Sequence, residues 1–466
     1  MKQLTRGLIA LAIGAVIWLI PVPEGLQAEA WHLFAIFVAT IAGFILQPLP
    51  IGSIAFISIT FTALTGVLKA ADVLSGFSAT NMWLIVSAFL FSRGFIKTGL
   101  GRRISYMLIA RLGDRTLKLG YILALSELII SPATPSNTAR GGGIIFPIAR
   151  SLSSAFQSEP GPTANRMGAF LMQIGYQGNV ITSAMFMTAM SGNPVIVLLA
   201  AKALNIDISW GLWAAAAIVP GLLSLLVIPY YLYKCYPPEI THTPTAKSLA
   251  LTELEVMGSM SFGEKVVAGV FTGALLLWGT SQYTSLDATV VAMMAVSAML
   301  MTRVLEWKDV LEEKGAWDTF IWMGSLVGLA NFLSKLGFIP WLAKVVSANM
   351  AGISWIPALL LIIAIYVYTH YGFASMVAHI VAMYSAFITV ATALGAPPYL
   401  AALSLAFMSS LCGSLTHYAA GPAPIYFGAG YIDQKTWWQQ GFAISVINLV
   451  IWVGIGSFWW KLLGLW

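Results

Sequence analysis

A polar segment that interrupts some of the most hydrophobic sequence in the chain holds the residues best suited to chemistry. Residues 131–152 read SPATPSNTARGGGIIFPIARSL, and the first 13 of them hold two prolines, the triplet Ser136, Asn137 and Thr138, an arginine and three consecutive glycines. Backbone groups released from a helix inside a bilayer must be satisfied by protein, water or a ligand, so the segment predicts a re-entrant hairpin or a discontinuous helix. Free N–H groups where its second arm begins, with hydroxyl and amide donors beside them, favour an anion. Without a ligand, the same residues would serve as a helix cap and a packing motif.

The elements that must position these residues are membrane helices. The chain has 466 residues, of which 59% are hydrophobic and 9% charged, against roughly 25% charged residues in a soluble domain. A helix needs about 20 apolar residues to cross a bilayer, and such stretches recur often enough to predict about ten to twelve spans. The N-terminal run, MKQLTRGLIALAIGAVIWLIPVPEG, is expected to form a span rather than a signal peptide, because no small-x-small cleavage site follows it.

The basic residues predict the orientation in the membrane. Seven lysines and arginines fall between residues 93 and 118 against a single acid, Asp114, which is typical of a cytoplasmic connection. Lys2 and Arg6 place the N-terminus inside, and the last 120 residues contain only two basic residues, so we expect the C-terminus outside and an odd number of crossings. Because the basic residues follow topology and form no patch interleaved with aromatics, we expect no nucleic-acid partner.

Two similar halves flank a polar connection. SAFLFSRGFIKTG in the first half and SLVGLANFLSKLG in the second share Ser, Lys and Gly at one constant displacement along the chain, and TAMSGNP at 188–194 has a counterpart in THYAAGP at 416–422. Repeats with an odd number of crossings are inverted in the membrane, so their polar segments would face one another at a single midplane site. The predicted organisation is N-terminal scaffold helices over 1–80, a first repeat with a hairpin and a broken helix over 81–234, the polar connection over 235–264, and a second repeat of the same kind, including scaffold helices, over 265–466.

Motifs in both halves resemble the divalent anion/sodium symporter family. The run Ser-Asn-Thr-Ala after a proline-broken helix is similar to the family signature, and YGFASMVAHIVAMYSAF (371–387) with GSLTHYAAGPAPIYFGAGYI (413–432) resembles its branch of di- and tricarboxylate exchangers. That branch translocates 2-oxoglutarate, malate, succinate or citrate. The resemblance covers the chain from about residue 30 onward. It implies an all-α polytopic fold of two inverted repeats with re-entrant hairpins, a scaffold with an elevator-type transport domain, and a homodimer.

The resemblance also implies which residues bind the substrate. Two hairpin tips and the loops that face them match the family, although the second tip departs from Ser-Asn-Thr and lacks an amide and a hydroxyl. In sodium-coupled members the same parts form sodium sites, so this departure puts sodium coupling in question. The expected contacts are Ser136, Asn137 and Thr138 at the first tip, Ser375, Met376 and Val377 at the second, and Ser191, Asn193, Gly421 and Pro422 in the loops.

Two residues beyond the tip serines are placed to balance the charge of a dicarboxylate. Arg140 follows Ser136 by four residues and His379 follows Ser375 by four, which puts each on the face of its tip serine. We hypothesise that Arg140, and His379 when protonated, replace sodium as the compensating charge. An empty carrier that keeps unpaired positive charge would cross the membrane reluctantly, so obligate exchange follows. The alternatives are an arginine that snorkels to the interface and a buried neutral histidine.

Other ionisable residues in the broken segments are candidates for ion coupling. Glu127, an acid inside an apolar run, is expected to pair with a basic neighbour or to carry a proton, and His417 is a second candidate. Three of the five histidines lie in broken regions of the second half, but no acid or cysteine joins them at a ligand spacing, so we expect no metal site. Cys235 and Cys412 are expected to be bystanders.

The predicted function is secondary active transport. We expect a sodium-independent exchanger of dicarboxylates of the 2-oxoglutarate, malate and succinate class, working as an elevator in a bacterial inner (plasma) membrane. A sodium- or proton-coupled di- or tricarboxylate symporter of the same fold is the alternative. No set of nucleophile, base and orienting group, no metal pattern and no phosphate loop occurs at a readable spacing, so we expect neither an enzyme nor a cofactor. The expected partners are small dicarboxylates, lipid and a second copy of the chain.

Overall fold

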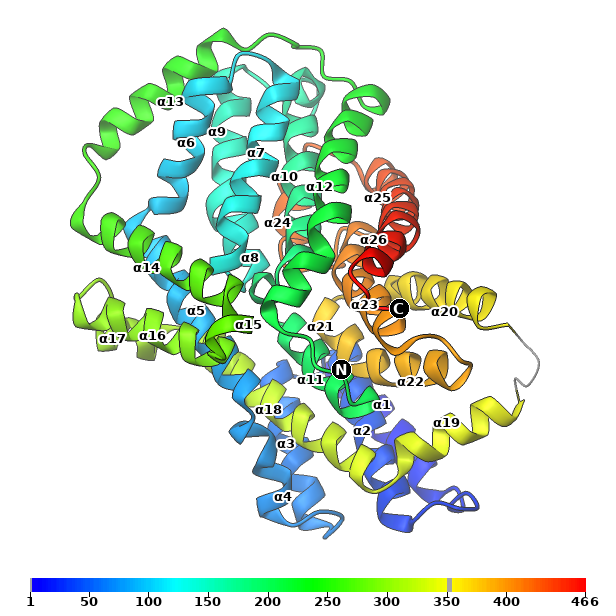
Figure 1. The fold of residues 1–466 in the computed structure, drawn as a ribbon. Helices are drawn as coiled ribbons and strands as arrows, with labels where there is room; N and C mark the ends of the chain where they lie inside the picture. The colour runs from blue at the N-terminus through cyan, green and yellow to red at the C-terminus, as the bar shows by residue number, and fades with distance from the viewer. Residues whose placement is uncertain (1, 350–353) are drawn as a thin grey trace.

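Helices make up the regular structure of the chain (Figure 1). The computed structural model describes residues 2–349 and 354–466, and the isolated bridge between Arg115 and His242 is the one extended pairing within these ranges. The first half and the polar connection contain α1 (Lys2–Leu19), α2 (Ala28–Leu46), α3 (Ile51–Leu64), α4 (Ala70–Leu74), α5 (Thr80–Thr98), α6 (Leu100–Leu112), α7 (Thr116–Ile130), α8 (Asn137–Arg140), α9 (Phe146–Ala155), α10 (Gly168–Met185), α11 (Asn193–Leu204), α12 (Trp210–Cys235) and α13 (Pro244–Met257). The second half contains α14 (Phe262–Gly279), α15 (Ser281–Thr284), α16 (Ala288–Met301), α17 (Trp307–Glu312), α18 (Lys314–Lys335), α19 (Phe338–Asn349), α20 (Trp355–Thr369), α21 (Met376–His379), α22 (Ser385–Ala393), α23 (Pro398–Leu411), α24 (Ala423–Gly428), α25 (Gln434–Leu449) and α26 (Gly456–Leu462).

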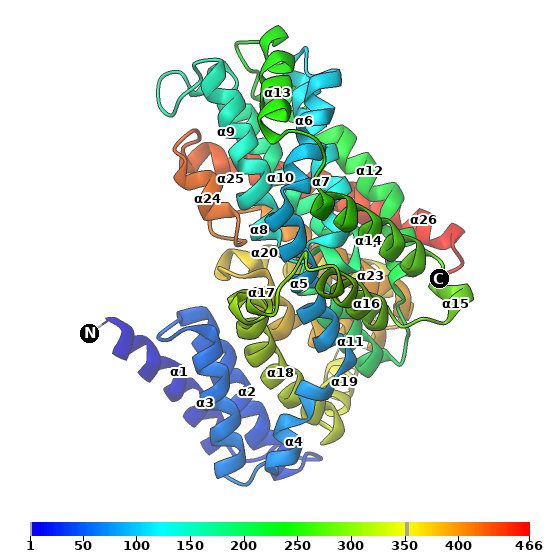
Figure 2. The ribbon, with the colours of Figure 1, turned by 90° about the vertical axis from the view of Figure 1, so that its left-hand side faces the viewer.

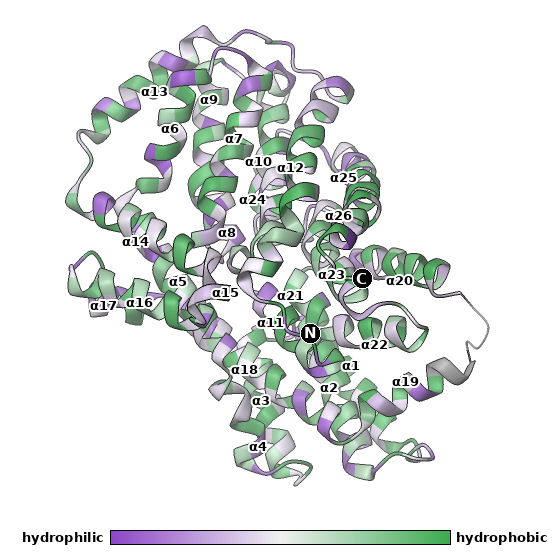
Figure 3. Cartoon of the chain, in the orientation of Figure 1, coloured by the Kyte–Doolittle hydropathy of each residue, from purple (hydrophilic) through white to green (hydrophobic). Residues whose placement is uncertain are grey.

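Many of these helices are apolar and long enough to span a membrane. Within the described ranges, seven helical segments meet the length and composition of a span, and the pair 70–78 and 80–98, bent by 48°, makes an eighth. This number is lower than the ten to twelve expected, because five further apolar helices, such as α3 and α16, have at most 17 residues. Figure 3 shows hydrophobic residues along the long helices, whereas hydrophilic residues gather on α13 and on the loops at that end of the molecule.

The two halves contain the same succession of elements around a broken helix. In the first half, α7 ends in a 3₁₀ turn at Ser131–Ala133, α8 follows, and a π-helical turn at Gly141–Ile145 leads into α9. In the second half, α20, a 3₁₀ turn at His370–Gly372, α21 and a π-helical turn at Ile380–Tyr384 occur in the same order before α22. Each of these elements in the second half begins the same number of residues after its counterpart in the first half. Single π-helical turns are frequent at functional sites, and here one follows each predicted tip.

Two central helices, α10 and α23, support the broken segments (Figures 1 and 2). All 18 residues of α10 are buried, as are 12 of the 14 residues of α23. Both helices contain several small residues, Gly, Ala and Ser in α10 and Ala and Ser in α23, which let membrane helices approach closely. Each also ends in a break: α10 leads through a 3₁₀ turn at Met187–Ala189 into α11, and α23 leads through a turn at Cys412–Ser414 toward α24.

Candidate functional site

The first hairpin tip presents polar groups at a partly exposed end. Ser136 is the N-cap of α8, and its Oγ accepts a hydrogen bond from the Ala139 N–H at 3.1 Å. The Asn137 carbonyl accepts a hydrogen bond from Asn179 Nδ2 at 3.1 Å, but Asn137 Nδ2 is buried and has no hydrogen-bond partner among the described residues. Ser136 and Thr138 are partly exposed. The tip therefore offers two hydroxyls and an unused amide donor.

The second tip repeats the cap with fewer donors. Ser375 is the N-cap of α21, and its Oγ accepts a hydrogen bond from the Ala378 N–H at 3.3 Å. Met376 is buried and Val377 is partly exposed. Thioether and methyl groups donate no hydrogen bonds, so the hydroxyl of Ser375 is the side-chain donor of this triplet.

Each tip contacts the broken loop of the other half. A Cβ added to Gly421 would come within 2.0 Å of Thr138 Oγ1 at the first tip. A Cβ added to Gly192 would come within 2.6 Å of Ile380 Cδ1 and 3.5 Å of Val377 Cγ2 in the second hairpin. Only glycine permits so close an approach of the backbone. The structure thus brings the predicted tips and loops together. Each tip lies against the loop of the other half.

The middle of α10 contacts the first tip and borders the same glycine, Gly413, as the second tip. Asn179 of α10 holds the Asn137 carbonyl, as described above. The next residue, Val180, faces Gly413, where an added Cβ would lie 3.6 Å from Val180 Cγ2 and 3.0 Å from Met376 Sδ. Asn179 therefore contacts the first hairpin directly, whereas Val180 and Met376 of the second hairpin both border Gly413.

Two of the predicted loop residues, Asn193 and Pro422, are buried in the protein. Asn193 is fully buried, and its Nδ2 donates to the Ser183 carbonyl at 2.8 Å and to the Phe186 carbonyl at 2.9 Å. These bonds satisfy carbonyls released where α10 ends, so Asn193 stabilises the break. Pro422 is buried at the start of α24, whereas Ser191 is partly exposed in its loop.

Arg140 lies in a buried polar network behind the first tip. Its Nε donates to Glu127 Oε2 at 2.5 Å, and neither side chain is exposed. Its Nη1 donates to the Thr134 carbonyl at 2.6 Å and to the Ala189 carbonyl at 3.0 Å, and its Nη2 donates to Ser183 Oγ at 3.0 Å. A buried charge requires such a partner and such bonds. Glu127 is thus paired with a basic neighbour, one of the two alternatives expected for it.

The hypothesis of an uncompensated charge at Arg140 therefore needs correction. The spacing of four residues places Arg140 behind Ser136 as expected, but the carboxylate of Glu127 on α7 neutralises its charge. Nor does Arg140 reach an interface, because it is fully buried. It brings no net charge of its own to the tip.

His379 is buried at the end of α21 among aromatic rings. Its Nε2 lies 3.2 Å from Thr369 Oγ1. The centroid of its ring lies 4.3 Å from that of Tyr366 and 5.0 Å from that of His370. Among the residues described, no carboxylate forms an ion pair with it. These surroundings favour the neutral histidine rather than a cation that faces the substrate.

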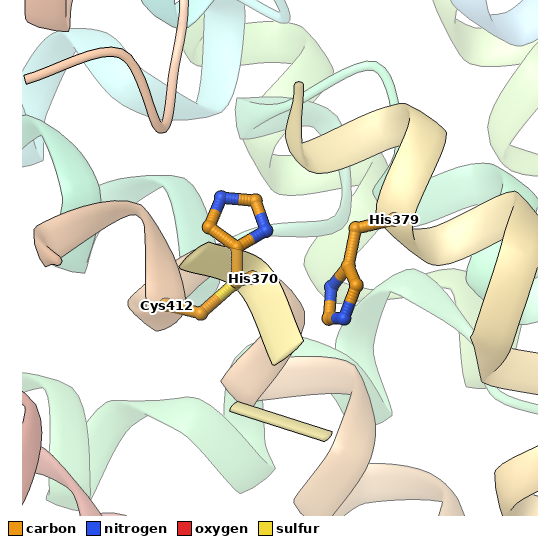
Figure 4. A group of neighbouring side chains, drawn as sticks. All are labelled: His370, His379 and Cys412. Atoms are coloured by element: carbon orange, nitrogen blue, oxygen red, sulfur yellow. The ribbon is translucent and has the colours of Figure 1, made fainter. Parts of the chain in front are cut away.

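Cys412 joins two histidines in space, which the sequence did not indicate. One ligand atom each of His370, His379 and Cys412 lies within 4.8 Å of the other two (Figure 4). Cys412 is well separated from both histidines along the chain, and the packing of α23 against the second hairpin brings it there. No cysteine lies at a ligand spacing from the histidines along the chain, but folding brings Cys412 to two of them, so the argument from spacing against a metal site does not hold here.

His417 is held by an aromatic neighbour. Its Nδ1 accepts a hydrogen bond from Trp438 Nε1 at 3.0 Å, and its ring centroid lies 4.4 Å from that of Phe427. The lone pair of Nδ1 is therefore occupied by this hydrogen bond.

An apolar cavity lies away from the tips. Its volume is about 600 Å³, and its lining comes from α1, α2 and α3 and the residues that join them, which Figure 2 shows apart from α8 and α10. The hydroxyls of Thr40 and Ser58 in its lining bond to each other. An anion would find no charged partner among the lining residues, so the tips remain the candidate site.

Comparisons with known proteins agree with the sequence motifs. The family model described as the sodium:sulfate symporter transmembrane region matches residues 1–466. The putative malate transporter YflS of Bacillus subtilis is 53% identical over 460 residues, covering 98% of this chain and 96% of the relative. The chloroplastic dicarboxylate transporter 1 of Arabidopsis thaliana is 46% identical over 462 residues, covering 98% and 83%. The inner membrane protein YbhI of Escherichia coli is 40% identical over 470 residues, covering 99% and 98%.

A solved structure shares the fold. The YdaH transporter of Alcanivorax borkumensis superimposes with a TM-score of 0.60 at 13% identity, covering 99% of this chain and 97% of that chain. This likeness confirms a multi-span, all-helical fold with broken spans. The family model and the relatives show a transporter rather than an enzyme. The chain belongs to the sodium:sulfate symporter family, also called the divalent anion/sodium symporter family, as its motifs indicated.

Proposed function

We propose that the protein exchanges dicarboxylates of the malate, succinate and 2-oxoglutarate class across a bacterial inner membrane, with the substrate held between the two hairpin tips. Relatives named for malate and dicarboxylate transport, 53% and 46% identical over nearly the whole chain, support the substrate class. The observation that carries the site is the crossed contact of each tip with the loop of the other half, at Thr138 with Gly421 and at Val377 with Gly192.

The donors at the tips suit a substrate with two unequal ends. A carboxylate accepts several hydrogen bonds, and the first tip offers the hydroxyls of Ser136 and Thr138 and the unused Nδ2 of Asn137. The second tip offers Ser375 and backbone N–H groups. One carboxylate would be bound at the first tip and the other, more weakly, at the second. This asymmetry favours a dicarboxylate over citrate.

The repeated succession of elements supports an elevator of inverted repeats. The two broken helices carry the same 3₁₀ turn, serine cap and π-helical turn at matching positions of the two halves. Inverted repeats place equivalent breaks opposite one another at the membrane midplane. The hairpins with α10 and α23 would form the transport domain, which would move against a scaffold that includes α1, α2 and α3, in a homodimer.

Unsatisfied donors, rather than free positive charge, would enforce exchange. Arg140 is neutralised by Glu127, so it adds no net charge to an empty carrier. Asn137 Nδ2, by contrast, lacks a partner within the described chain, and a buried unsatisfied donor costs about 1–3 kcal/mol. An empty carrier would keep this unsatisfied donor while it crosses the membrane. A bound carboxylate would accept the hydrogen bond and remove the cost.

Sodium independence follows from the ligands that the second tip lacks. Sodium is held by oxygen atoms, and Met376 and Val377 supply none from their side chains. The alternative is a sodium- or proton-coupled symporter of the same fold, in which Glu127 or His417 would take part in coupling.

Counterflow in proteoliposomes tests the proposal. Vesicles that contain the purified protein are loaded with malate or left empty, and the uptake of labelled malate is measured in sodium-free buffer. Uptake should require internal dicarboxylate and should be unaffected by added sodium. Uptake into empty vesicles that depends on a sodium or proton gradient would establish the symporter instead, and no uptake in any arm would refute dicarboxylate transport.

Variants at the first tip test whether the transported malate is bound there. Asn137→Ala removes the unused amide donor and should lower the apparent affinity for malate about tenfold, which corresponds to about 1.4 kcal/mol. Gly428→Ala is the matched control, because no atom lies within 4 Å of an added Cβ at Gly428. If the two variants transport malate alike, the substrate is not bound at this tip.

A further inference from the structure

Three ligand-type side chains converge behind the second hairpin. His370 begins the 3₁₀ turn after α20, His379 ends α21, and Cys412 begins the 3₁₀ turn after α23. All three are fully buried, and one ligand atom of each lies within 4.8 Å of the other two. The proposed transport site uses none of these atoms.

The hydrogen bonds of His370 fix which of its nitrogens is free. Its Nε2 lies 2.9 Å from the Ala419 carbonyl, and a carbonyl only accepts, so Nε2 carries the hydrogen. In a neutral ring Nδ1 then keeps its lone pair. That Nδ1 is buried and has no hydrogen-bond partner in the part of the chain that the structure describes.

The same reasoning applies to His379. Its Nε2 contacts Thr369 Oγ1 at 3.2 Å, and the Thr369 hydroxyl donates its hydrogen to the Tyr366 carbonyl at 2.8 Å. The hydroxyl oxygen must therefore accept from His379 Nε2, which leaves Nδ1 with its lone pair. This Nδ1 is also buried without a partner among the described residues. Figure 4 shows the Nδ1 edges of the two rings turned toward each other.

We propose that His370, His379 and Cys412 form a binding site for a transition-metal ion of the Zn²⁺ type, with both Nδ1 atoms and the sulfur as ligands. Imidazole nitrogen and thiolate are preferred ligands of zinc. In known zinc sites the second nitrogen of a ligating histidine donates to a carbonyl or similar acceptor, which the Ala419 carbonyl and the Thr369 hydroxyl already provide.

The distances require little rearrangement. Zn–N bonds of about 2.0 Å and Zn–S bonds of about 2.3 Å in a tetrahedral site separate the ligand atoms by roughly 3.3–3.8 Å. The present separations of up to 4.8 Å would shorten by about 1 Å. Cys412 now donates its S–H to the Ser409 carbonyl at 3.3 Å, and it would release that proton to solvent on binding. Three protein ligands leave the fourth position to a water molecule.

Such an ion would link the segments that lie before and after the second tip with the break after α23. His370 precedes Ser375, His379 follows it, and Cys412 lies at the break after α23. A divalent ion with one thiolate also leaves one net positive charge behind a tip that has few donors. This consequence for the substrate rests on the proposed function, whereas the metal site itself does not.

Metal binding to the purified full-length protein in detergent tests the proposal without transport. The Cys235→Ser variant leaves Cys412 as the single thiol, since the chain has two cysteines. This variant should retain one Zn²⁺ per chain after removal of free metal, and Co²⁺ in its place should give a near-ultraviolet thiolate-to-cobalt absorption band. No retained metal, or cobalt bound without that band, would overturn the proposal even if malate exchange is observed.

Substitution of the ligands then locates the ion. Cys412→Ser should abolish the band, and His379→Ala should lower the Zn²⁺ affinity at least tenfold, while His242→Ala at an exposed histidine should change neither. Thermal unfolding without metal identifies any variant that fails to fold, and for such a variant the Cys235→Ser spectrum alone decides. A folded Cys412→Ser variant that keeps the band would refute the assignment.

Discussion

Behind Ser136 the first hairpin buries the ion pair of Arg140 and Glu127, whereas behind Ser375 the second hairpin buries two histidines for which the described chain supplies no ion pair. Yet the backbones match: each serine accepts a hydrogen bond from the N–H three residues on, and each one-turn helix continues into a π-helical turn. The backbone of the break thus depends on the cap and the turns. The buried chemistry behind it can differ without changing that geometry.

The difference gives the two tips separate roles. In the first hairpin the buried charges of Arg140 and Glu127 neutralise each other, so this ion pair holds the two arms of the hairpin together and would leave neutral donors for the proposed substrate. In the second, neutral rings and a thiol pack behind a tip with one side-chain hydroxyl. The first hairpin would therefore fix one carboxylate, and the second would adapt to the other end of the substrate.

Breaking the ion pair of Arg140 and Glu127 should give the largest loss of stability among the variants that test this comparison. Glu127→Gln leaves Arg140 buried without its counter-charge, and the loss of one partner of a buried pair typically costs about 3–5 kcal/mol of stability. Thermal and denaturant unfolding in detergent should register that loss. His379→Ala in the second hairpin removes no charge and should cost about 2 kcal/mol, the cost of an ordinary buried substitution.

The double variant Glu127→Gln with Arg140→Met is the control. It removes both charges, so it should recover part of the stability lost in Glu127→Gln. If Glu127→Gln costs no more than His379→Ala, the ion pair does not hold the first hairpin together, and the contrast between the hairpins fails.

The glycines that face the tips test the crossed contacts. Gly421→Ala would bring a Cβ within 2.0 Å of Thr138 Oγ1, on a β-branched side chain with little freedom. Overpacking of this kind costs about 1–3 kcal/mol, so the apparent affinity for malate in counterflow should fall about tenfold or more. Gly192→Ala meets the flexible end of Ile380 at 2.6 Å and should have a smaller effect.

A larger effect at Gly192 than at Gly421 would reverse the assignment of the stronger site to the first tip. Equal flux in Gly421→Ala and wild type would show that Thr138 can move away without loss, and hence that its hydroxyl does not bind the substrate.

The sequence predicted the positions of the breaks because local chemistry determines them. Proline removes a backbone donor and restricts the residue before it, and serine caps the helix that follows, so Ser136 is identifiable without a structure. The resemblance of the second half to the family motifs then identified Ser375 as the counterpart of Ser136. The partners behind the tips were not predictable in this way. Arg140 and Glu127 lie on opposite arms of a hairpin, and Cys412 reaches the histidines only through the packing of α23.

The serine caps test whether the two breaks are equivalent in stability. Ser136→Ala and Ser375→Ala each remove one cap hydrogen bond, and each should lower the free energy of unfolding by about 1 kcal/mol. Glycine at either position costs only a few tenths of a kcal/mol. Ser136→Gly should therefore remain stable but bind malate more weakly, because it keeps a permissive cap and loses the hydroxyl. If Ser136→Gly binds malate normally, the serine is a cap alone.

Removal of an exposed helix cap outside the hairpins should give the smallest loss of stability. It serves as a reference for the loss of the serine caps. The carboxylate of Asp433, the N-cap of α25, accepts from Thr436 Oγ1 at 2.6 Å and from the Thr436 N–H at 3.0 Å. These hydrogen bonds hold the pKa of Asp433 below its ordinary value. A lowered pKa in the folded state means that the stabilisation is present near neutral pH and is lost as pH falls through that pKa.

Asp433→Ala should therefore cost about 0.5 kcal/mol at neutral pH, the low end for a helix cap. The difference from wild type should begin to shrink as pH falls below about 4, the ordinary pKa of an aspartate, and should go on shrinking through the lower pKa of the folded state. The corresponding difference for Ser136→Ala should stay constant over that range, because a hydroxyl does not titrate there. Unfolding curves at a series of pH values measure both. A pH-dependent effect at Ser136 would mean that its cap is coupled to a titrating group, and the buried pair of Glu127 and Arg140 behind the tip would be the candidate.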